Sequence, residues 1–209
     1  MAYGVKYRVS WKDVYNVDCR VDISQDGYSG SITSVTATDN PLTIEWPSER
    51  GNQFKAVRGA IATLNVWAET VAQFDEFFDA YETEYKMEVY YNSALDWTGW
   101  VMVGEHQEDI AYPPYQVSFM AYDLGYFQTI NYEPTIIDDY PISTILIEIL
   151  GFTGFTLGFT DGINIYDSNM STTTTTYSPL VQATMHKRVL FDDDMGFMTC
   201  YDALALILH

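Results

Sequence analysis

The chain has 209 residues, of which 47% are hydrophobic and 16% aromatic, a composition that supports a folded core and excludes a mostly disordered chain. Its formal net charge of −19, from 29 acidic against 10 basic residues, disfavours binding to nucleic acids and to anionic membrane surfaces. The longest apolar run, around Glu148, is too short to cross a bilayer, so we expect neither sequence-specific nucleic-acid binding nor a membrane segment.

The first 124 residues are dominated by strand patterns. Residues 3–46 alternate between apolar and polar side chains with a period of two, and turn residues interrupt the alternation. The same alternation predicts further strands over residues 59–69, 84–92, 97–110 and 115–123. We therefore expect an α+β, mainly β fold in which residues 1–124 form a barrel-like antiparallel sheet domain.

One helix is predicted inside this domain, over residues 70–81. Thr70 can act as its N-cap, because a threonine hydroxyl can accept a hydrogen bond from a backbone N–H of the first turn. Apolar side chains then recur at helical spacing, at Val71, Phe74, Phe77, Phe78 and Tyr81. We expect this helix to pack against the sheet.

The pattern changes after Gly125. Residues 125–142 contain two prolines and predict a linker, and residues 143–209 predict a second region of mixed α/β structure. A short helix is expected from Ser143, as its N-cap, to Gly151, and another after Thr199. The last helix reaches the end of the chain without a glycine or proline stop signal, which predicts that the second region is truncated.

The two cysteines, Cys19 and Cys200, lie near opposite ends of the chain. No CxxC motif or Cys/His cluster is present, so the sequence predicts no zinc site. Two buried free thiols are the commoner arrangement for such a pair, and a disulfide between them remains the alternative.

Motifs of known catalytic chemistry are missing from the sequence. His106, His186 and His209 are far apart, and no nucleophile elbow, zinc-protease motif or phosphate-binding glycine loop occurs. The acidic run 192–194 lacks the alternating spacing of a calcium loop. We therefore predict a non-enzymatic protein with no catalytic, cofactor-binding or metal-binding residues and no cofactor.

Two alternatives remain open at this stage. Trp97 and Trp100 could form a sugar-binding platform of a carbohydrate-binding or adhesin-like module, together with Trp67, Tyr90 and Tyr91. Cross-strand aromatic pairs in a β core are the more common cause of such a pattern. More remotely, paired carboxylates could hydrolyse a glycoside. The acids concerned are Glu105, Glu108 and Asp109 beside the tryptophans, or Asp192, Asp193 and Asp194, and a solvated acidic surface is the simpler interpretation of both sets.

The order of features over most of the chain resembles the hub or tail-tip proteins of tailed bacteriophages and prophages. Gly99-Trp100-Val101 is similar to the W-x-G strand of that family. The segment from Ala121 to Gly125 is similar to its A-x-D-G-L turn, with leucine and glycine exchanged. A proline-marked linker and a short helix such as residues 143–151 follow in that family, as they do in this sequence.

The resemblance implies a structural role. Such proteins form trimers whose barrel-like domains make a ring that joins the tail tube to the tip, and this module of the family has no catalytic residues. We thus expect self-association as a homotrimer, other tail proteins as partners, and a place in the virion tail after synthesis in the bacterial host cytoplasm. We expect Asp123 to hydrogen-bond the turn at which the chain leaves the first domain, as aspartate often does at turns.

Overall fold

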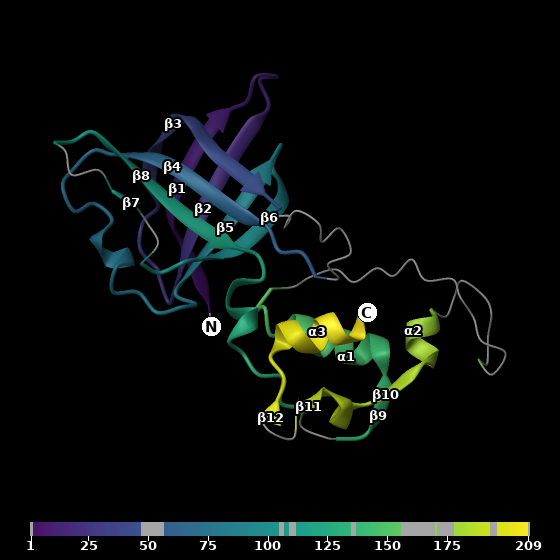
Figure 1. Cartoon of the computed structure of the whole chain (residues 1–209). Coiled ribbons are helices and arrows are strands. Elements are labelled where there is room, and N and C mark those ends of the chain that lie inside the picture. The colour runs from purple at the N-terminus through teal and green to yellow at the C-terminus, as the bar shows by residue number, and fades with distance from the viewer. Residues whose placement is uncertain are drawn as a thin grey trace. The chain divides into compact units, whose positions relative to one another are not determined.

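The computed structural model describes residues 2–46, 57–104, 107–108, 112–134, 137–155, 170, 178–192 and 196–208 (Figure 1). Over these residues the protein is mainly β, as the sequence predicts, and three α-helices accompany the strands. The chain divides into two compact units. The first consists of Met1–Gln53 and Arg58–Gly125, and the second of Phe54–Val57 and Tyr126–His209.

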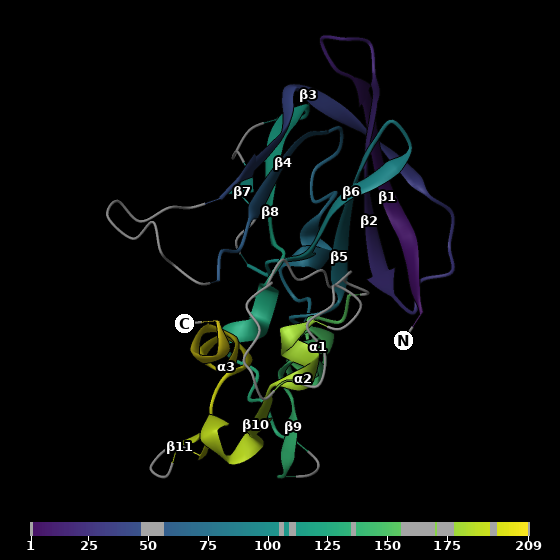
Figure 2. The same ribbon diagram turned by 90° about the vertical axis from the view of Figure 1, so that its right-hand side faces the viewer.

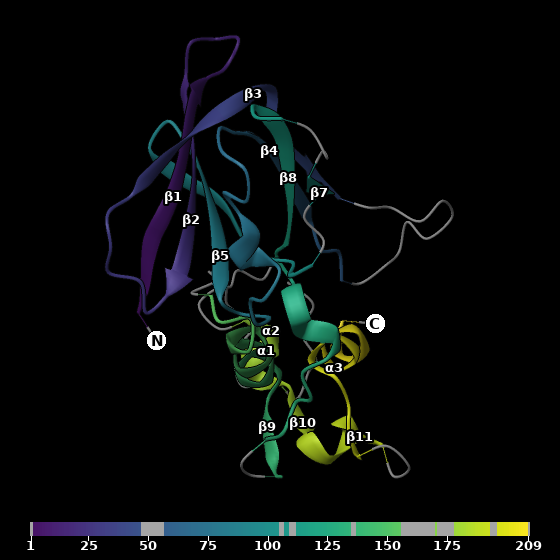
Figure 3. The same ribbon diagram turned by 90° about the vertical axis from the view of Figure 1, so that its left-hand side faces the viewer.

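One large sheet forms the first unit. Its strands are β1 (Tyr3–Lys12), β2 (Asp18–Asp26), β3 (Thr33–Glu45), β4 (Ile61–Ala68), β5 (Tyr85–Tyr91), β6 (Ala94–Val101), β7 (Gln107–Glu108) and β8 (Tyr115–Tyr122). In space the order is β4-β3-β1-β2-β5-β6-β8, and β8 pairs again with β4, so seven strands close in a ring (Figures 2 and 3). Each neighbouring pair is antiparallel except β1 and β3. The expected closure of the sheet is confirmed.

Alternation along the strands explains why the ring has an apolar interior. β8 buries every second side chain, at Tyr115, Val117, Phe119 and Ala121. These residues join alternating residues of the other strands in one hydrophobic core. The ring is completed between β6 and β8 by only two register pairs, of which one joins Val101 to Ala121.

The prediction of a helix over residues 70–81 is wrong. Only Asp75–Phe77 are helical, as the short 3₁₀ helix η1, and they follow a turn. Ala72 has a φ of 62°, a left-handed conformation that an α-helix does not contain. The hydrogen bonds that follow join residues three apart, such as Phe77 N to Phe74 O at 3.0 Å. Phe74 and Phe77 are therefore buried, whereas Phe78 is half exposed.

The second unit contains short elements. They are η2 (Gly125–Gln128), whose first residue belongs to the first unit, β9 (Asp139–Pro141), α1 (Ile142–Gly151), α2 (Pro179–Gln182), β10 (Thr184–His186), η3 (Lys187–Leu190), β11 (Phe191–Asp192), β12 (Gly196–Phe197) and α3 (Cys200–Ile207). β9 pairs with β10, and β11 with β12. The predicted linker, residues 125–142, contains the buried residues Phe127 and Tyr132, and from Tyr126 onward it belongs to the second unit.

Both helices expected in the second region are present. Thr199 caps α3 as predicted, because its hydroxyl oxygen accepts a hydrogen bond from Asp202 N at 3.1 Å. Ser143 is not the N-cap of α1, since the helix begins at Ile142 with Pro141 as its N-cap, and Ser143 is buried within its first turn. Among the described residues, no helix is both long and apolar enough to cross a membrane.

The two cysteines are buried and free, in agreement with the first of the two expectations for them. Cys19 lies on β2 in the first unit, and Cys200 begins α3 in the second. Burial raises the pKa of the Cys200 thiol to about 11, so the thiol is protonated at neutral pH.

Candidate functional site

Asp123 follows β8 directly, and its carboxylate is used by the backbone around it. Oδ1 accepts hydrogen bonds from Ala60 N at 2.8 Å and from Leu124 N at 2.6 Å. The backbone N of Asp123 donates in turn to Ala60 O at 3.3 Å. Asp123 thus fastens the end of β8 to the start of β4, and the predicted hydrogen bond to the turn is confirmed.

The electrostatics of Asp123 agree with this structural role. Burial raises the pKa of the carboxyl above its ordinary value of 3.8, and the hydrogen bonds from Ala60 and Leu124 oppose that shift. Gly59 lies close by, where an added Cβ would be 3.0 Å from Asp123 Oδ1. One oxygen of this half-buried carboxylate, Oδ1, is therefore engaged by two backbone N–H groups.

Trp97 and Trp100 lie on opposite faces of β6. Trp97 is paired with the core residue Val89 and packs against the hydrophobic core. Trp100 is buried next to Tyr3, with 5.6 Å between the ring centroids, and its neighbour Val101 is the residue that faces the core. The two indoles do not form one flat surface, which is the geometry that a shared sugar platform requires.

The other aromatic residues of the predicted sugar platform, Tyr90, Tyr91 and Trp67, have separate contacts. The Tyr90 ring lies 4.0 Å from the guanidinium carbon of Arg20, a cation–π contact. The hydroxyl of Tyr91 donates to Asp13 Oδ2 at 3.1 Å. Trp67, on β4, is partly exposed and lines a pocket of about 420 Å³ with Pro113 and Pro114, among other residues. The aromatic residues considered together in the sequence are therefore spread over different parts of the sheet.

Most of the acids in the glycosidase alternative lie outside the part of the chain that the structure describes. Glu105, Asp109, Asp193 and Asp194 fall there, and the side chains of Glu108 and Asp192 are also undescribed. His106 and His209 lie outside the described residues as well. His186 is described, and its Nδ1 accepts a hydrogen bond from Arg188 N at 3.2 Å. Among the described residues, no group of three His, Cys, Asp or Glu side chains could hold a metal ion.

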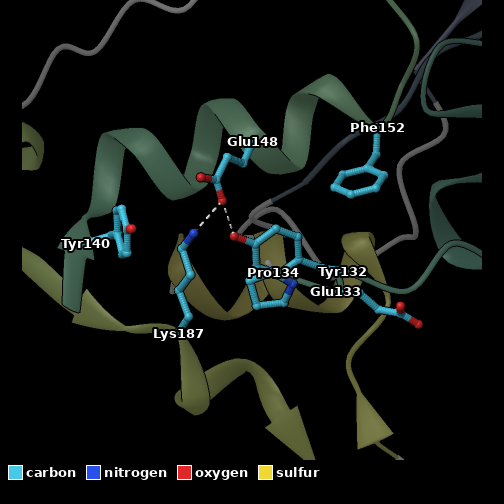
Figure 4. Close-up of a pocket in the computed structure, with 7 residues that line it drawn as sticks. All are labelled: Tyr132, Glu133, Pro134, Tyr140, Glu148, Phe152 and Lys187. Carbon is cyan, nitrogen blue, oxygen red and sulfur yellow. Dashed lines mark hydrogen bonds and ion pairs between the residues drawn. The ribbon is translucent and has the colours of Figure 1, made fainter. Parts of the chain in front are cut away.

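A pocket of about 330 Å³ lies within the second unit and contains a charged cluster (Figure 4). Glu148 of α1 accepts two hydrogen bonds on the same oxygen, Oε2. One comes from Lys187 Nζ at 2.7 Å and the other from the Tyr132 hydroxyl at 2.5 Å. The Lys187 ammonium also lies 4.1 Å from the centroid of the Tyr140 ring. This cluster therefore connects α1, η3 and the segment that contains Tyr132.

The two charges of the cluster differ in burial. The Lys187 side chain is 4% exposed, whereas that of Glu148 is 38% exposed. Burial raises the pKa of Glu148, but the hydrogen bonds from Lys187 and Tyr132 outweigh it, and the pKa lies below its ordinary value of 4.5. Burial and the hydrogen bond to Glu148 raise the pKa of Tyr132, which stays protonated. The cluster thus brings the Lys187 side chain and the Tyr132 hydroxyl to one carboxylate oxygen of Glu148.

This arrangement is suited to holding three segments together. Glu148 Oε2 accepts from both neighbours, so a single carboxylate oxygen of α1 joins Lys187 and Tyr132 to the helix. The sequence did not identify the cluster, because Lys187 and Glu148 are 39 residues apart. One signal was present: Glu148 interrupts an otherwise apolar helix, where an unpaired carboxylate would be costly.

The outer face of the first unit carries paired charges of the same kind. Asp22 on β2 is buried and accepts from Arg8 Nε at 2.7 Å and Nη2 at 2.9 Å, and Arg20 Nε lies 3.2 Å from it. Lys6 forms an ion pair with Glu76 of η1, which joins β1 to the η1 segment. Asp22 thus has two arginines beside it, and these pairs join neighbouring elements.

No protein-family model matches this chain, and no curated protein matches it.

Proposed function

We propose that this protein is a structural component of a phage tail or phage-tail-like particle, a hub or tail-tip protein that joins the tail tube to the tip through ring-forming protein–protein contacts. Its partners are other tail proteins and further copies of itself, with a homotrimer as the assembled form. It acts without catalysis, and its place is the virion tail.

The observation that carries the proposal is the closed sheet, together with the turn after β8 that Asp123 holds by hydrogen bonds. Seven strands close around an apolar core, so the interior of the ring is occupied by side chains and the outer surface is what remains for binding. At the end of β8, Asp123 holds the turn through Ala60 and Leu124. The resemblance to hub proteins rests on this same strand and turn, and a rigid module is what a ring component needs.

The carbohydrate-binding alternative is less well supported. It requires indole rings that a sugar can reach together, and Trp97 and Trp100 lie on opposite faces of β6 with Trp100 buried. A glycan array tests it directly, because binding that is lost in Trp97→Ala would favour a sugar-binding module over a structural one.

Purified particles provide the test of the proposed function. Phage or phage-tail-like particles are isolated from the native cells on a density gradient, and their proteins are quantified by mass spectrometry. We expect this chain to sediment with the particles, at a copy number that is a multiple of three. Its absence from particles that contain the other tail proteins would contradict the proposal.

A further inference from the structure

We propose that the tip of the β1–β2 hairpin is a docking element for a second, different protein, whose contact surface is an apolar recess with basic residues at its rim. The tip consists of residues 13–17. It belongs to the first unit, and Figures 2 and 3 show the hairpin extending beyond the other strands of the ring.

The end of this hairpin exposes large apolar side chains. Val14 is 93% exposed and Tyr15 is 82% exposed. The neighbouring β5–β6 hairpin adds the exposed Tyr91 and Leu95. Tyrosine is among the residues that most often anchor protein–protein interfaces, because a large, stiff ring loses little conformational entropy on binding. The tip therefore has the chemistry of an anchor that enters a recess.

Hydrogen bonds hold the tip in one conformation. Asp13 Oδ1 accepts from Tyr15 N and from Val17 N, both at 2.8 Å, and Asn16 N donates to Asp13 O at 3.0 Å. Asn16 has a φ of 64°, a conformation that asparagine tolerates better than most residues. The tip is thus organised before binding, which lowers the entropy cost of docking.

The second hairpin supports the first. Tyr91 donates to Asp13 Oδ2 at 3.1 Å, and Asn92 N donates to Asp18 O at 2.9 Å. The carboxylate of Asp13 therefore organises its own loop and contacts the neighbouring one. The surface that a partner meets is formed by two loops that hold each other.

Charge indicates what kind of partner fits. The two hairpins carry three acids beside the apolar residues, Asp13, Asp18 and Asp96, and one basic residue, Lys12, which is paired with Asp18 at 2.8 Å, so the tip as a whole is acidic. An acidic rim around an apolar anchor is complementary to a basic rim around an apolar recess. The net charge of −19 would also steer a basic partner toward the chain.

A second copy of this chain is a poorer match for the tip. Among the described residues, six basic side chains already form ion pairs with acids of the same chain. The apolar pocket beside Trp67 has Glu69 in its lining, which would repel the acids of the tip. The self-association proposed above therefore uses other surfaces, and this inference does not depend on it.

Photo-crosslinking from the tip tests the inference. Tyr15 is replaced by p-benzoyl-phenylalanine in the full chain, the protein is produced in its native cells, and the crosslinked peptides are identified by mass spectrometry after irradiation. The control carries the same probe at Tyr112, which is 95% exposed and lies outside the tip. We expect position 15 to crosslink to one other protein, at an apolar peptide flanked by lysine or arginine, and the control not to do so.

The partner found in this way is then purified and its affinity is measured. The double variant Val14→Ser/Tyr15→Ser should bind at least about ten-fold more weakly than the original chain, because anchor residues carry most of an interface's free energy. Its thermal midpoint should be unchanged, since both side chains are exposed. Affinity should also fall as the ionic strength rises.

Three results would overturn the inference: crosslinks to another copy of this chain, crosslinks shared with the Tyr112 control, or no crosslink at all. The outcome is separable from that of the proposed function. A crosslinked partner that is not a tail protein would support the docking inference and contradict the proposed tail function. If the chain is found in tails but its tip gives no crosslink, the tail function is supported and the docking inference is contradicted.

Discussion

At the scale of single residues, Asp123 decides how the chain leaves the closed sheet. In Asp123→Ala the amides of Ala60 and Leu124 lose their shared acceptor, and we expect the free energy of unfolding to fall by about 1–3 kcal/mol. Asp123→Asn keeps one acceptor oxygen and should lose less. Urea denaturation measures both, with Asp79→Ala as the exposed control. Equal stability of Asp123→Ala and the control would contradict the assigned role.

The pair of Glu148 and Lys187 should respond asymmetrically to substitution. Glu148→Gln leaves the buried Lys187 ammonium without its counter-ion and should cost about 3 kcal/mol. Lys187→Met removes the buried charge and leaves Glu148 partly in solvent, and should cost about 1 kcal/mol. The double variant should be more stable than Glu148→Gln alone. If Lys187→Met were the more harmful single change, the burial asymmetry would not govern this site.

The same pair sets a pH dependence. Because the pKa of Glu148 in the folded chain lies below its ordinary value of 4.5, its ionised form stabilises the fold at a pH above 4.5. That contribution is lost as the pH falls through the lowered pKa. The difference in unfolding free energy between the original chain and Glu148→Gln should therefore be constant near neutral pH and shrink below pH 4.5. If this difference in unfolding free energy grew on acidification, the ionised form of Glu148 would not be the stabilising one.

At the scale of elements, substitutions around η1 can show whether this segment is a 3₁₀ turn or an amphipathic α-helix. Phe77 and Phe78 are adjacent, yet only Phe77 is in the core. We expect Phe77→Ala to cost about 3–5 kcal/mol and Phe78→Ala at most about 1 kcal/mol. Thermal denaturation of the two variants compares them directly. Similar losses at both positions would favour the continuous helix over the observed turn.

Strand β6 requires glycine at one position. A Cβ on Gly99 would lie 2.3 Å from the Trp97 ring and 2.8 Å from the backbone carbonyl carbon of Tyr122, and backbone cannot move aside cheaply. Gly99→Ala should lower the free energy of unfolding by about 1–3 kcal/mol. Gly151→Ala, where nothing lies within 4 Å of the added Cβ, is the matched control and should be neutral or slightly stabilising. Equal thermal midpoints of Gly99→Ala and Gly151→Ala in calorimetry would contradict the close packing around Gly99.

The elements differ in how well the sequence predicts them. Strands such as β4 and β8 have one face in the core, so their alternation is visible in the sequence. The helix over residues 70–81 was predicted wrongly, because the spacing of its apolar residues also fits a turn, and the left-handed Ala72 leaves no mark in that spacing. Asp123 could be predicted from turn chemistry, which is local. The hydrogen bond between Glu148 and Lys187 could not be predicted, because the two residues are 39 positions apart and the fold of the chain between them brings them together.

At the scale of the whole molecule, composition and architecture favour contact with other proteins. The acidic charge disfavours nucleic acid, the closed sheet is filled by its core, and six basic side chains of the described residues are paired with acids of the same chain. What remains available on the first unit is a surface that includes the exposed hairpin tip. The proposed tail assignment unites these features, because a ring component needs a rigid body and exposed contact points.

Immunogold electron microscopy of intact particles shows whether the protein lies in a tail, as we propose. An antibody against the chain is applied to particles purified from the native cells, with particles from a strain that lacks the gene as the control. We expect gold at one end of the tail, where the tube meets the tip. Unlabelled tails, with the protein found only outside particles, would contradict it.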